Sequence, residues 1–359
     1  MTRPETSLRD LVGEEFGPYK LVRRLGIGGM AETFEAIRSG PSGFQQRVCL
    51  KLVLPFFQDD ENFIELFQRE AKLAARLRHS NIVGVIDFGE AGGRYYMALE
   101  LVDGCDLRTL LDAQDRTRLP WEHVTLIGLD LSAGLEHAHH PSEQKAVDES
   151  GSHVQAIVHR DISPGNVLIS RRGEILLTDF GVAKAITGTA RKQSTVKGKI
   201  PYMSPEQLKG EVVDGRADLF ALGVVLFEAM SGRRPYEGAH DPATIMLTLS
   251  GEHPSLRELA PEAPDGLCEV IESLLDPDVE RRPQTAAVLI ESLDDFAPPR
   301  RIRRKLGEMV AETAQAAELL ARDVSSAVVE NARRRAAAGE APTVRTLEGS
   351  DTKSRRRAV

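Results

Sequence analysis

The chain has 359 residues, of which 41% are hydrophobic and 28% charged, and its formal net charge is −8. This composition is typical of a globular protein, and the length suits one two-lobed domain with a tail or two to three smaller domains. No apolar run approaches the roughly 20 residues that cross a bilayer, and the opening residues lack the apolar region of a secretory signal. We therefore expect a cytoplasmic protein without a membrane span.

Charge and cysteine content narrow the range of partners. Residues 298–359 contain 14 Lys and Arg against 8 Asp and Glu, which leaves a net charge of −14 on residues 1–297. An acidic body disfavours nucleic acid as the main partner. The three cysteines are scattered and form no CxxC or Cys/His cluster, so neither a zinc site nor a disulfide framework is expected.

The first hundred residues predict a sheet with one prominent helix. Residues 1–18 are polar, and we expect a flexible N-terminus there. Apolar residues at helical spacing indicate a helix between Asp59 and Arg78. Strand patterns surround it, in residues 19–29, 33–40, 47–55, 81–90 and 94–102.

From residue 107 onward the pattern changes to helices. Two helical segments are predicted within 107–140, and residues 204–296 form a series of helical patterns separated by Pro and Gly turns. A sheet followed by helices predicts an α+β fold with two unequal lobes. We expect a small lobe at about 19–101 and a larger, helical lobe at about 102–297.

The last sixty residues are rich in Ala, Arg and Glu. A weak apolar stripe begins at Ile302 and Leu306 and predicts a helix within 298–338. Such a helix either packs on the body, remains in solvent, or mediates self-association. We expect the basic residues 339–359 to be disordered, and truncation after Pro299 to leave activity nearly unchanged.

A glycine-rich turn follows the first predicted strand, with Gly26, Gly28 and Gly29 in the sequence GIGGMA. Glycine lets backbone N–H groups approach phosphates closely, although an ordinary β-turn uses the same residues. A dinucleotide-binding turn would lead into a helix, whereas here another strand follows. The turn alone therefore indicates a phosphate site only weakly.

A lysine lies inside the next apolar strand, at Lys51 in VCLKLV. A buried ammonium needs an anionic partner, although a lysine on an edge strand can instead extend into solvent. Glu70, on the predicted helix, is a candidate partner. Together the two residues would form an ion pair that directs the ammonium toward a phosphate.

Three polar residues lie next to predicted strands in the second half of the chain. Asp161 and Asn166 belong to HRDISPGN, and Asp179 belongs to LTDFG. Carboxylate and amide oxygens suit Mg²⁺, which completes its shell with phosphate and water oxygens. Asn166 and Asp179 are therefore candidate metal ligands, and Asp161 is left to accept a proton from an attacking hydroxyl.

Taken together, these motifs resemble those of the protein kinases, and in particular the eukaryotic-like Ser/Thr kinases of bacteria. The resemblance covers about residues 19–297 and includes the glycine turn, the strand lysine, the helix glutamate, HRD…N, DFG, YMSPEQ, DLFALG and RRP. It implies a bilobal fold that binds Mg-ATP between its lobes and transfers the γ-phosphoryl group to Ser or Thr hydroxyls of protein substrates.

The resemblance also implies a role for each residue at a matching position. Lys51 holds the ATP phosphates and pairs with Glu70. Asp161 is the catalytic base, while Asn166 and Asp179 hold Mg²⁺. The remaining ATP contacts fall to the glycine turn and to the segment between the lobes, namely Gly26, Gly28, Gly29, Glu100, Val102 and Asp106, with Leu99 as gatekeeper.

Structural and regulatory roles follow from the same resemblance. Glu206 is expected to pair with Arg282 inside the large lobe, and Asp218 to brace the backbone of the catalytic loop. Residues 182–198 match the activation segment. We expect phosphorylation of a hydroxyl there, with the phosphate pairing to Arg160.

Two departures from the family pattern adjoin the catalytic aspartate. Ser163 stands where a phosphate-binding lysine is usual, and Lys199 stands where a threonine is usual. In kinases of known fold these two positions face each other. We therefore hypothesise a positional exchange, in which catalysis uses the ammonium of Lys199, contacting Asp161 and the γ-phosphate.

Three classes of function remain open: an active protein kinase, a pseudokinase that uses the fold for binding, and a kinase of small molecules. The presence of Lys51, Asp161, Asn166 and Asp179 disfavours a pseudokinase. The long segment between Asp179 and Glu206 favours protein substrates over small molecules. We expect an active Ser/Thr protein kinase that uses ATP and Mg²⁺.

Overall fold

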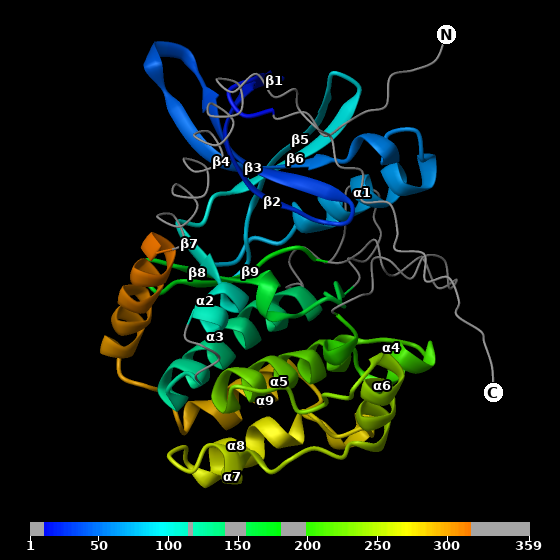
Figure 1. Cartoon of the computed structure of the whole chain (residues 1–359), viewed down its shortest axis with the longest axis vertical. Coiled ribbons are helices and arrows are strands. Elements are labelled where there is room, and N and C mark those ends of the chain that lie inside the picture. The colour runs from blue at the N-terminus through cyan, green and yellow to red at the C-terminus, as the bar shows by residue number, and fades with distance from the viewer. Residues whose placement is uncertain (1–10, 114–117, 141–155, 181–198, 317–359) are drawn as a thin grey trace, which may run out of the picture. The chain divides into compact units, whose positions relative to one another are not determined.

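Two lobes make up the main body of the molecule. The structure is a computed structural model, and it describes residues 11–113, 118–140, 156–180 and 199–316. The chain divides into two compact units, Met1–Thr313 and Ala314–Val359, and both lobes belong to the first. Strands dominate the small lobe and helices the large one (Figure 1), which confirms the predicted α+β bilobal fold.

The small lobe contains a sheet of six strands: β1 (Glu15–Phe16), β2 (Tyr19–Ile27), β3 (Ala31–Ser39), β4 (Gln45–Val53), β5 (Val85–Ala91) and β6 (Arg94–Glu100). All neighbours are antiparallel, in the order β1-β2-β3-β4-β6-β5. Strand β1 lies within the residues predicted to be flexible. Its Phe16 packs edge-on against Tyr96, with 6.0 Å between the ring centroids, and this contact explains why the chain joins the sheet early.

Helix α1 (Glu61–Ala74) lies against this sheet and forms within the segment predicted to be helical. The side chain of Asp60 accepts a hydrogen bond of 3.1 Å from the backbone N–H of Phe63, which caps the helix. Phe63 and Phe67 point into the small lobe and are buried. This packing fixes the rotation of the helix and so determines the direction in which Glu70 points.

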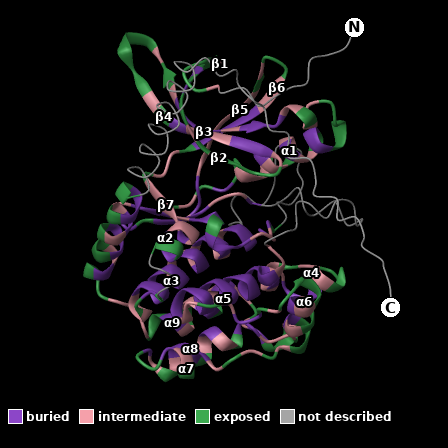
Figure 2. Cartoon of the chain, viewed as in Figure 1, coloured by how far each residue is buried: buried purple, intermediate pink, exposed green. Residues whose placement is uncertain are grey.

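The large lobe is formed by the helices α2 (Leu107–Ala113), α3 (Trp121–His139), α4 (Pro205–Lys209), α5 (Gly215–Ser231), α6 (Asp241–Ser250), α7 (Leu256–Leu259), α8 (Asp265–Ser273) and α9 (Ala286–Asp294). Every residue of α5 from Ala217 to Met230 is buried, which makes this helix the centre of the lobe (Figure 2). Helix α3 packs against both α5 and α9. No helix within the described ranges is long and apolar enough to cross a bilayer.

A second, three-stranded sheet lies beside the connection between the lobes. It contains β7 (Gly104–Asp106), β8 (Val167–Ser170) and β9 (Ile175–Leu177), in that order. Leu177 donates its backbone N–H to the carbonyl of Asn81 at 2.9 Å, and its own carbonyl accepts from Val83 at 3.0 Å. Strand β9 is thereby held to the small lobe as well as to β8, just before the chain reaches Asp179.

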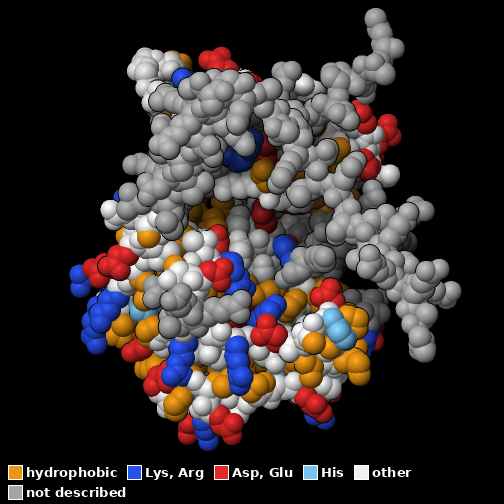
Figure 3. All heavy atoms as spheres, viewed as in Figure 1, with side chains coloured by type: hydrophobic (Ala, Val, Ile, Leu, Met, Phe, Trp, Pro, Cys, Tyr) orange, Lys and Arg blue, Asp and Glu red, His pale blue; other side chains and the backbone are white. Residues whose placement is uncertain are grey.

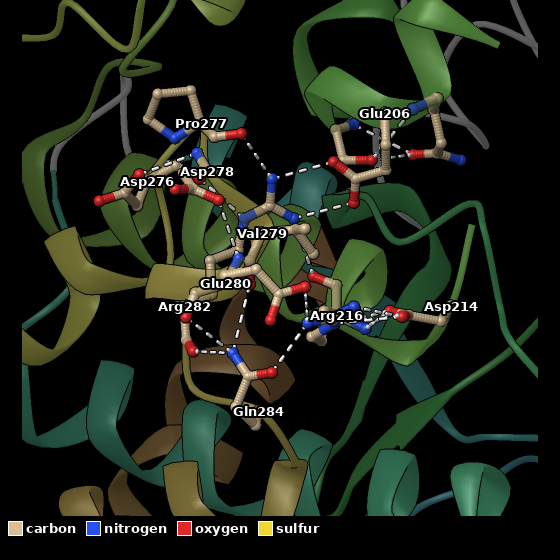
Figure 4. Close-up of polar contacts among 12 residues, drawn as sticks. Glu206, Asp214, Arg216, Asp276, Pro277, Asp278, Val279, Glu280, Arg282 and Gln284 are labelled. Carbon is tan, nitrogen blue, oxygen red and sulfur yellow. Dashed lines mark hydrogen bonds and ion pairs between the residues drawn. The ribbon is translucent and has the colours of Figure 1, made fainter. Parts of the chain in front are cut away.

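The predicted pair of Glu206 and Arg282 is confirmed. The guanidinium of Arg282 donates two hydrogen bonds to the carboxylate of Glu206, at 2.8 and 2.9 Å (Figure 4). It also donates to the carbonyl of Asp276 at 2.7 Å and lies over the ring of Phe220, 4.9 Å from the centroid. Because the Arg282 side chain is fully buried, these contacts satisfy a charge that would otherwise be costly to bury.

A further helix begins at residue 301, and its residues 301–313 extend the large lobe past the predicted boundary at residue 297. Ile302, Leu306 and Val310 are buried in the same apolar core as α3 and α5. This part of the helix therefore packs on the body, which was the first of the predicted alternatives. Its apolar face is not available for self-association. Self-association stays a prediction only for residues 317–338, which lie outside the described residues.

The turn between β8 and β9 receives this helix through close backbone contacts. A Cβ atom on Gly173, whose φ is +79°, would lie 2.0 Å from the carbonyl oxygen of Arg303, and one on Gly307 would lie 2.6 Å from that of Arg171. Arg303 also donates two hydrogen bonds to the carboxylate of Asp130, at 2.6 and 2.8 Å. These contacts give the chain after Pro299 a structural role in the large lobe, and the expectation that truncation there leaves activity nearly unchanged stays a prediction.

We expect truncation after Pro299 to lower the melting temperature by about 10 °C or more, because it removes three buried aliphatic side chains, whose burial is worth roughly 5 kcal/mol together, and uncovers the core beneath them. Leu306→Ala should cost about 2–5 kcal/mol through the cavity that it leaves. The matched control is Arg304→Ala, at a side chain that is 74% exposed, which should change little. Thermal denaturation measures all three, and an unchanged melting temperature for the truncated chain contradicts this assignment.

Candidate active site

The loop that carries Asp161 is held by a buried carboxylate on α5. Asp218 accepts hydrogen bonds from the backbone N–H groups of His159 and Arg160, both at 2.7 Å. His139 also contacts it, at 2.8 Å from Nε2. The predicted bracing role of Asp218 is thus confirmed. This support is needed because Arg160 has a φ of +63°, a left-handed backbone that non-glycine residues rarely adopt.

His159 connects this loop to the segment around Asp179. Its Nε2–H donates to the carbonyl of Thr178 at 3.0 Å, and its Nδ1 accepts from the backbone N–H of Asp161 at 3.2 Å. Its ring lies 4.5 Å from that of Phe180. Burial lowers the pKa of His159, so the ring is neutral, as a donor on one nitrogen and an acceptor on the other require.

Asn166 is positioned directly beside Asp161. Its Nδ2 donates to the backbone carbonyl of Asp161 at 2.7 Å and to Oδ2 of the same residue at 3.3 Å. The backbone carbonyl of Asn166 accepts from the backbone N–H of Thr178 at 3.0 Å. This hydrogen bond joins the start of β8 to the end of β9. The side chain amide therefore turns its nitrogen to Asp161 and keeps its oxygen as a candidate ligand.

Lys51 joins the two lobes. Its Nζ lies 2.8 Å from Oδ1 of Asp179 and 3.5 Å from Oε1 of Glu70. Burial would lower the pKa of Lys51, but the carboxylates of Asp179 and Glu70 outweigh burial and raise this pKa. The predicted pair with Glu70 is present, yet the shorter contact is to Asp179. Sequence reasoning missed this contact, because the two residues are 128 positions apart and the motifs assign them separate tasks.

The two carboxylates that share Lys51 respond to it differently. Burial would raise the pKa of Asp179, but the ammonium of Lys51 outweighs burial and lowers it. For Glu70 burial prevails over Lys51, and the pKa is raised. Lys51 therefore stabilises the charge of Asp179 more than that of Glu70. Asp179 itself has a φ of +59°, a strained backbone of the kind that is concentrated at functional sites.

The donors at this site fit Mg²⁺ only with help from a second molecule. Asn166 and Asp179 offer an amide and a carboxylate oxygen, which are suitable hard ligands. No group of three or more His, Cys, Asp and Glu side chains within the described ranges is arranged to hold a metal ion. Phosphate and water oxygens would have to complete the shell, as is usual for Mg²⁺ in nucleotide sites.

Lys199 reaches Asp161, the candidate catalytic base, as the hypothesis of a positional exchange requires. Its Nζ donates to Oδ2 of Asp161. Lys199 immediately precedes the 3₁₀ helix η6 (Ile200–Tyr202), and Ser163, two residues after Asp161, is buried. The structure therefore places an ammonium group at Asp161 from the opposite segment. Its function in phosphoryl transfer is a proposal.

The other candidate ATP contacts lie in the turn after β2 and around the connection between the lobes. Gly26 is the second-last residue of β2 and lies opposite Thr33, and the N–H of Gly28 donates to the carbonyl of Ala31 at 2.8 Å, which closes a tight turn. Of the remaining candidates, Gly29 is in this turn, Glu100 ends β6, Val102 lies in the connection between the lobes, and Asp106 caps α2 by accepting from Thr109 at 2.7 Å. The buried gatekeeper candidate, Leu99, lies in β6.

A sheet-rich lobe that supplies a lysine, and a helical lobe that supplies two aspartates and an asparagine, define a bilobal phosphotransferase fold. The family described as "Protein kinase domain" matches residues 19–293. The chain therefore belongs to the protein kinase family.

Relatives and solved structures agree with this assignment. The chain is 39% identical over 286 residues to "Tyrosine-protein kinase MasK" of Myxococcus xanthus, covering 79% of this chain and 43% of MasK. It is 34% identical over 267 residues to "Probable serine/threonine-protein kinase PknB" of Lactococcus lactis, covering 74% and 39%. The crystal structure of the Mycobacterium tuberculosis PknI kinase domain matches with a TM-score of 0.57 and 27% identity, covering 81% of this chain and 99% of that one. The chain thus spans about two fifths of the length of these two curated relatives.

Proposed function

We propose that the chain is an active Ser/Thr protein kinase that transfers the γ-phosphoryl group of ATP to protein hydroxyls. The observation that carries this proposal is the meeting of Lys51 from the small lobe with Asp179 from the large lobe at 2.8 Å, beside Asn166 and Asp161. Phosphoryl transfer depends almost wholly on positioning and charge neutralisation, and these are the groups that it requires. The complete set supports catalysis over a pseudokinase that only binds.

In this proposal each residue acts on a different part of the reaction. Lys51 binds the ATP phosphates, and its ion pair with Glu70 directs the Lys51 ammonium toward them. Asp161 orients the acceptor hydroxyl and takes its proton. Asn166 and Asp179 would hold Mg²⁺, which neutralises charge on the phosphate oxygens.

The adenosine part of ATP would be held by the segment between the lobes. Backbone groups of Glu100 and Val102 contact the adenine, and Asp106 reaches the ribose. Gly26, Gly28 and Gly29 let the turn approach the phosphates without side chains in the way. The three cysteines are free thiols, which together with a need for ATP supports a cytoplasmic site of action.

Lys199 is the residue that we propose supplies the charge expected at position 163. From Asp161 its ammonium can contact the γ-phosphoryl group while the acceptor hydroxyl approaches. A lysine suits this task because its long stem delivers a point charge from a different backbone anchor. Both its contact to Asp161 and the small side chain of buried Ser163 support this role.

The acceptor class is supported by the relatives that are named Ser/Thr kinases, among them "Serine/threonine-protein kinase PrkC" of Bacillus subtilis, at 34% identity. One relative is named a tyrosine kinase, so tyrosine is the specific alternative. We expect the full chain, incubated with Mg-ATP, to phosphorylate itself on Ser or Thr within 182–198, with Thr195 first. These residues lie outside the described residues.

Mass spectrometry of the purified, incubated chain measures both site and residue type. A fully active chain without phosphate in 182–198 contradicts regulation through this segment. Phosphate on tyrosine alone overturns the Ser/Thr assignment but keeps the kinase. An Asp161→Asn chain serves as the matched control, because it should acquire no phosphate of its own.

A further inference from the structure

A buried carboxylate lies in the small lobe, just beyond the glycine turn. Glu32, the second residue of β3, is only 1% exposed. Its Oε1 lies 2.9 Å from a guanidinium nitrogen of Arg94, the first residue of β6, and its Oε2 lies 3.5 Å from Arg24 on β2. A carboxylate is costly to bury unless nearby cations compensate its charge. The proposed function gives this group of charges no role.

The guanidinium of Arg94 also holds the end of β4. It donates to the backbone carbonyl of Val53 from Nε at 3.1 Å and from Nη2 at 2.8 Å. Val53 is the last residue of β4, two residues after Lys51, and it is paired with Ala31, the residue before Glu32. One planar guanidinium therefore joins the strand that leaves the glycine turn to the strand that carries Lys51.

Glu32 and Lys51 point to opposite faces of the sheet. Side chains alternate along a strand, and Thr33, the residue after Glu32, is paired with Lys51. Glu32 itself is paired with Leu52, which is fully buried in the core on the other face. The carboxylate is therefore not placed to contact phosphates at Lys51. An effect of Glu32 on bound phosphates has to pass through the backbone of β3.

The glycine turn depends on its flanking strands for its position. Its glycines have no side chains to pack, and their backbone adopts many conformations readily. The carbonyl of Met30, at the end of the turn, accepts from the N–H of Leu54 at 3.0 Å. Leu54 directly follows Val53, so this hydrogen bond lies at the junction that Arg94 holds. Loss of the buried ion pair would loosen the junction from which the turn projects.

A second buried glutamate of β3 provides an internal comparison. Glu35 is 4% exposed and lies 2.6 Å from both Arg23 and Arg47, but these arginines are more than half exposed. Figure 3 shows Lys and Arg intermingled with Asp and Glu over the visible surface of the large lobe, where water screens such pairs. Arg94 is only 12% exposed, so its pair with Glu32 is shielded from this screening.

We propose that Glu32 and Arg94 form a clamp that fixes the glycine turn over the strand of Lys51 and so sets the affinity for nucleotide phosphates. The clamp rests on the proposed kinase function, because it presumes that ATP phosphates bind between the turn and Lys51. Glu32 is a positioning residue in this scheme, since it acts through the backbone of β3. Arg94 is its partner, because it contacts both strands at once.

Binding of Mg-ADP and of adenosine to the full chain, measured by isothermal titration calorimetry, tests the clamp. Adenosine lacks phosphates, so the ratio of the two Kd values isolates the contribution of the phosphates. Glu32→Gln removes the charge with little change of shape, and it should weaken Mg-ADP roughly fivefold while adenosine binds as before. Effects of this size are typical of residues that influence a site without touching its ligand. The KM for ATP should rise by a similar factor, and kcat should change less.

Arg94→Gln should have the same effect, because Arg94 holds both Glu32 and Val53. The double variant should weaken Mg-ADP no further than either change alone, since the two residues act as one unit. Glu35→Gln is the matched control, because it breaks a buried pair on the same strand, three residues farther from the turn, and should keep both Kd values.

Thermal denaturation verifies that each variant is folded. Glu32→Asp and Arg94→Lys keep the charges but break the shared geometry, and they replace any variant that does not fold. The same selective loss of Mg-ADP affinity is expected for them.

The outcomes separate the clamp from the kinase function. Folded Glu32 and Arg94 variants that bind Mg-ADP as tightly as the unmodified chain overturn the clamp and leave the kinase function standing. An equal loss for Mg-ADP and adenosine also overturns the clamp, because it shows a general defect of the small lobe. Additive effects in the double variant show that the two residues act separately. An unmodified chain that binds neither ligand overturns the kinase function and the clamp together.

Discussion

Asp179→Asn is expected to lower the rate of phosphoryl transfer by roughly 10³-fold or more, and Lys51→Met is expected to lower it by a similar factor. Asp179 is the carboxylate that would hold Mg²⁺, and a bound metal stabilises developing charge by several kcal/mol, of which each 1.36 kcal/mol corresponds to a factor of about ten. Lys51→Met removes the ammonium that lies 2.8 Å from Asp179 and would bind the phosphates. Single-turnover kinetics with radiolabelled ATP measure both rates.

Exposed residues provide matched controls for these two variants. Lys20→Met on β2 and Asp295→Asn after α9 make the same chemical changes on the surface and should keep the rate of the unmodified chain. Thermal denaturation without nucleotide establishes that the variants are folded. If Asp179→Asn transfers phosphate at nearly the original rate, the metal assignment is wrong.

Lys199→Thr is expected to lower kcat by roughly 10²-fold, in line with the loss of one preorganised electrostatic contact to the transferring group. The double variant Lys199→Thr, Ser163→Lys should regain a substantial part of this loss, because the ammonium returns to the same space from the other anchor. Independent sites would give additive effects and no recovery. Steady-state kinetics at saturating ATP measure kcat separately from KM.

A control for charge alone is available at the end of α4. Lys209→Thr removes a lysine that is exposed and should leave kcat unchanged. An unchanged kcat for Lys199→Thr would show that the contact with Asp161 has no catalytic consequence. Ser163 would then indicate a slow enzyme rather than an exchanged position.

Those elements that local pattern determines could be predicted from the sequence. Alternating residues placed the strands from β2 to β6, and helical spacing placed α1, because one face of each is buried in the same lobe. The roles proposed for Lys51, Asp161, Asn166 and Asp179 came from motifs, and the structure brings these residues together. The contact of Lys199 with Asp161 was anticipated only because two departures from the motif pattern matched each other.

What the sequence could not predict depends on tertiary contacts. The stripe at Ile302 and Leu306 looked weak, yet both side chains are buried, because Gly173 and Gly307 let the backbones touch. No local pattern indicates which glycines serve such a contact. Likewise, the position of Arg108 in an ordinary helical segment did not reveal that it covers Glu228 from another helix.

The contact between Lys51 and Asp179 has a thermodynamic consequence for ligand binding. In the proposed function one ammonium serves two anions in turn, because the ATP phosphates would compete with Asp179 for Lys51. When the phosphates bind Lys51, the carboxylate of Asp179 loses this partner. It then repels the phosphates electrostatically until a cation binds. Nucleotide and Mg²⁺ should therefore bind with positive heterotropic cooperativity, and by reciprocity each should raise the affinity of the other by the same factor.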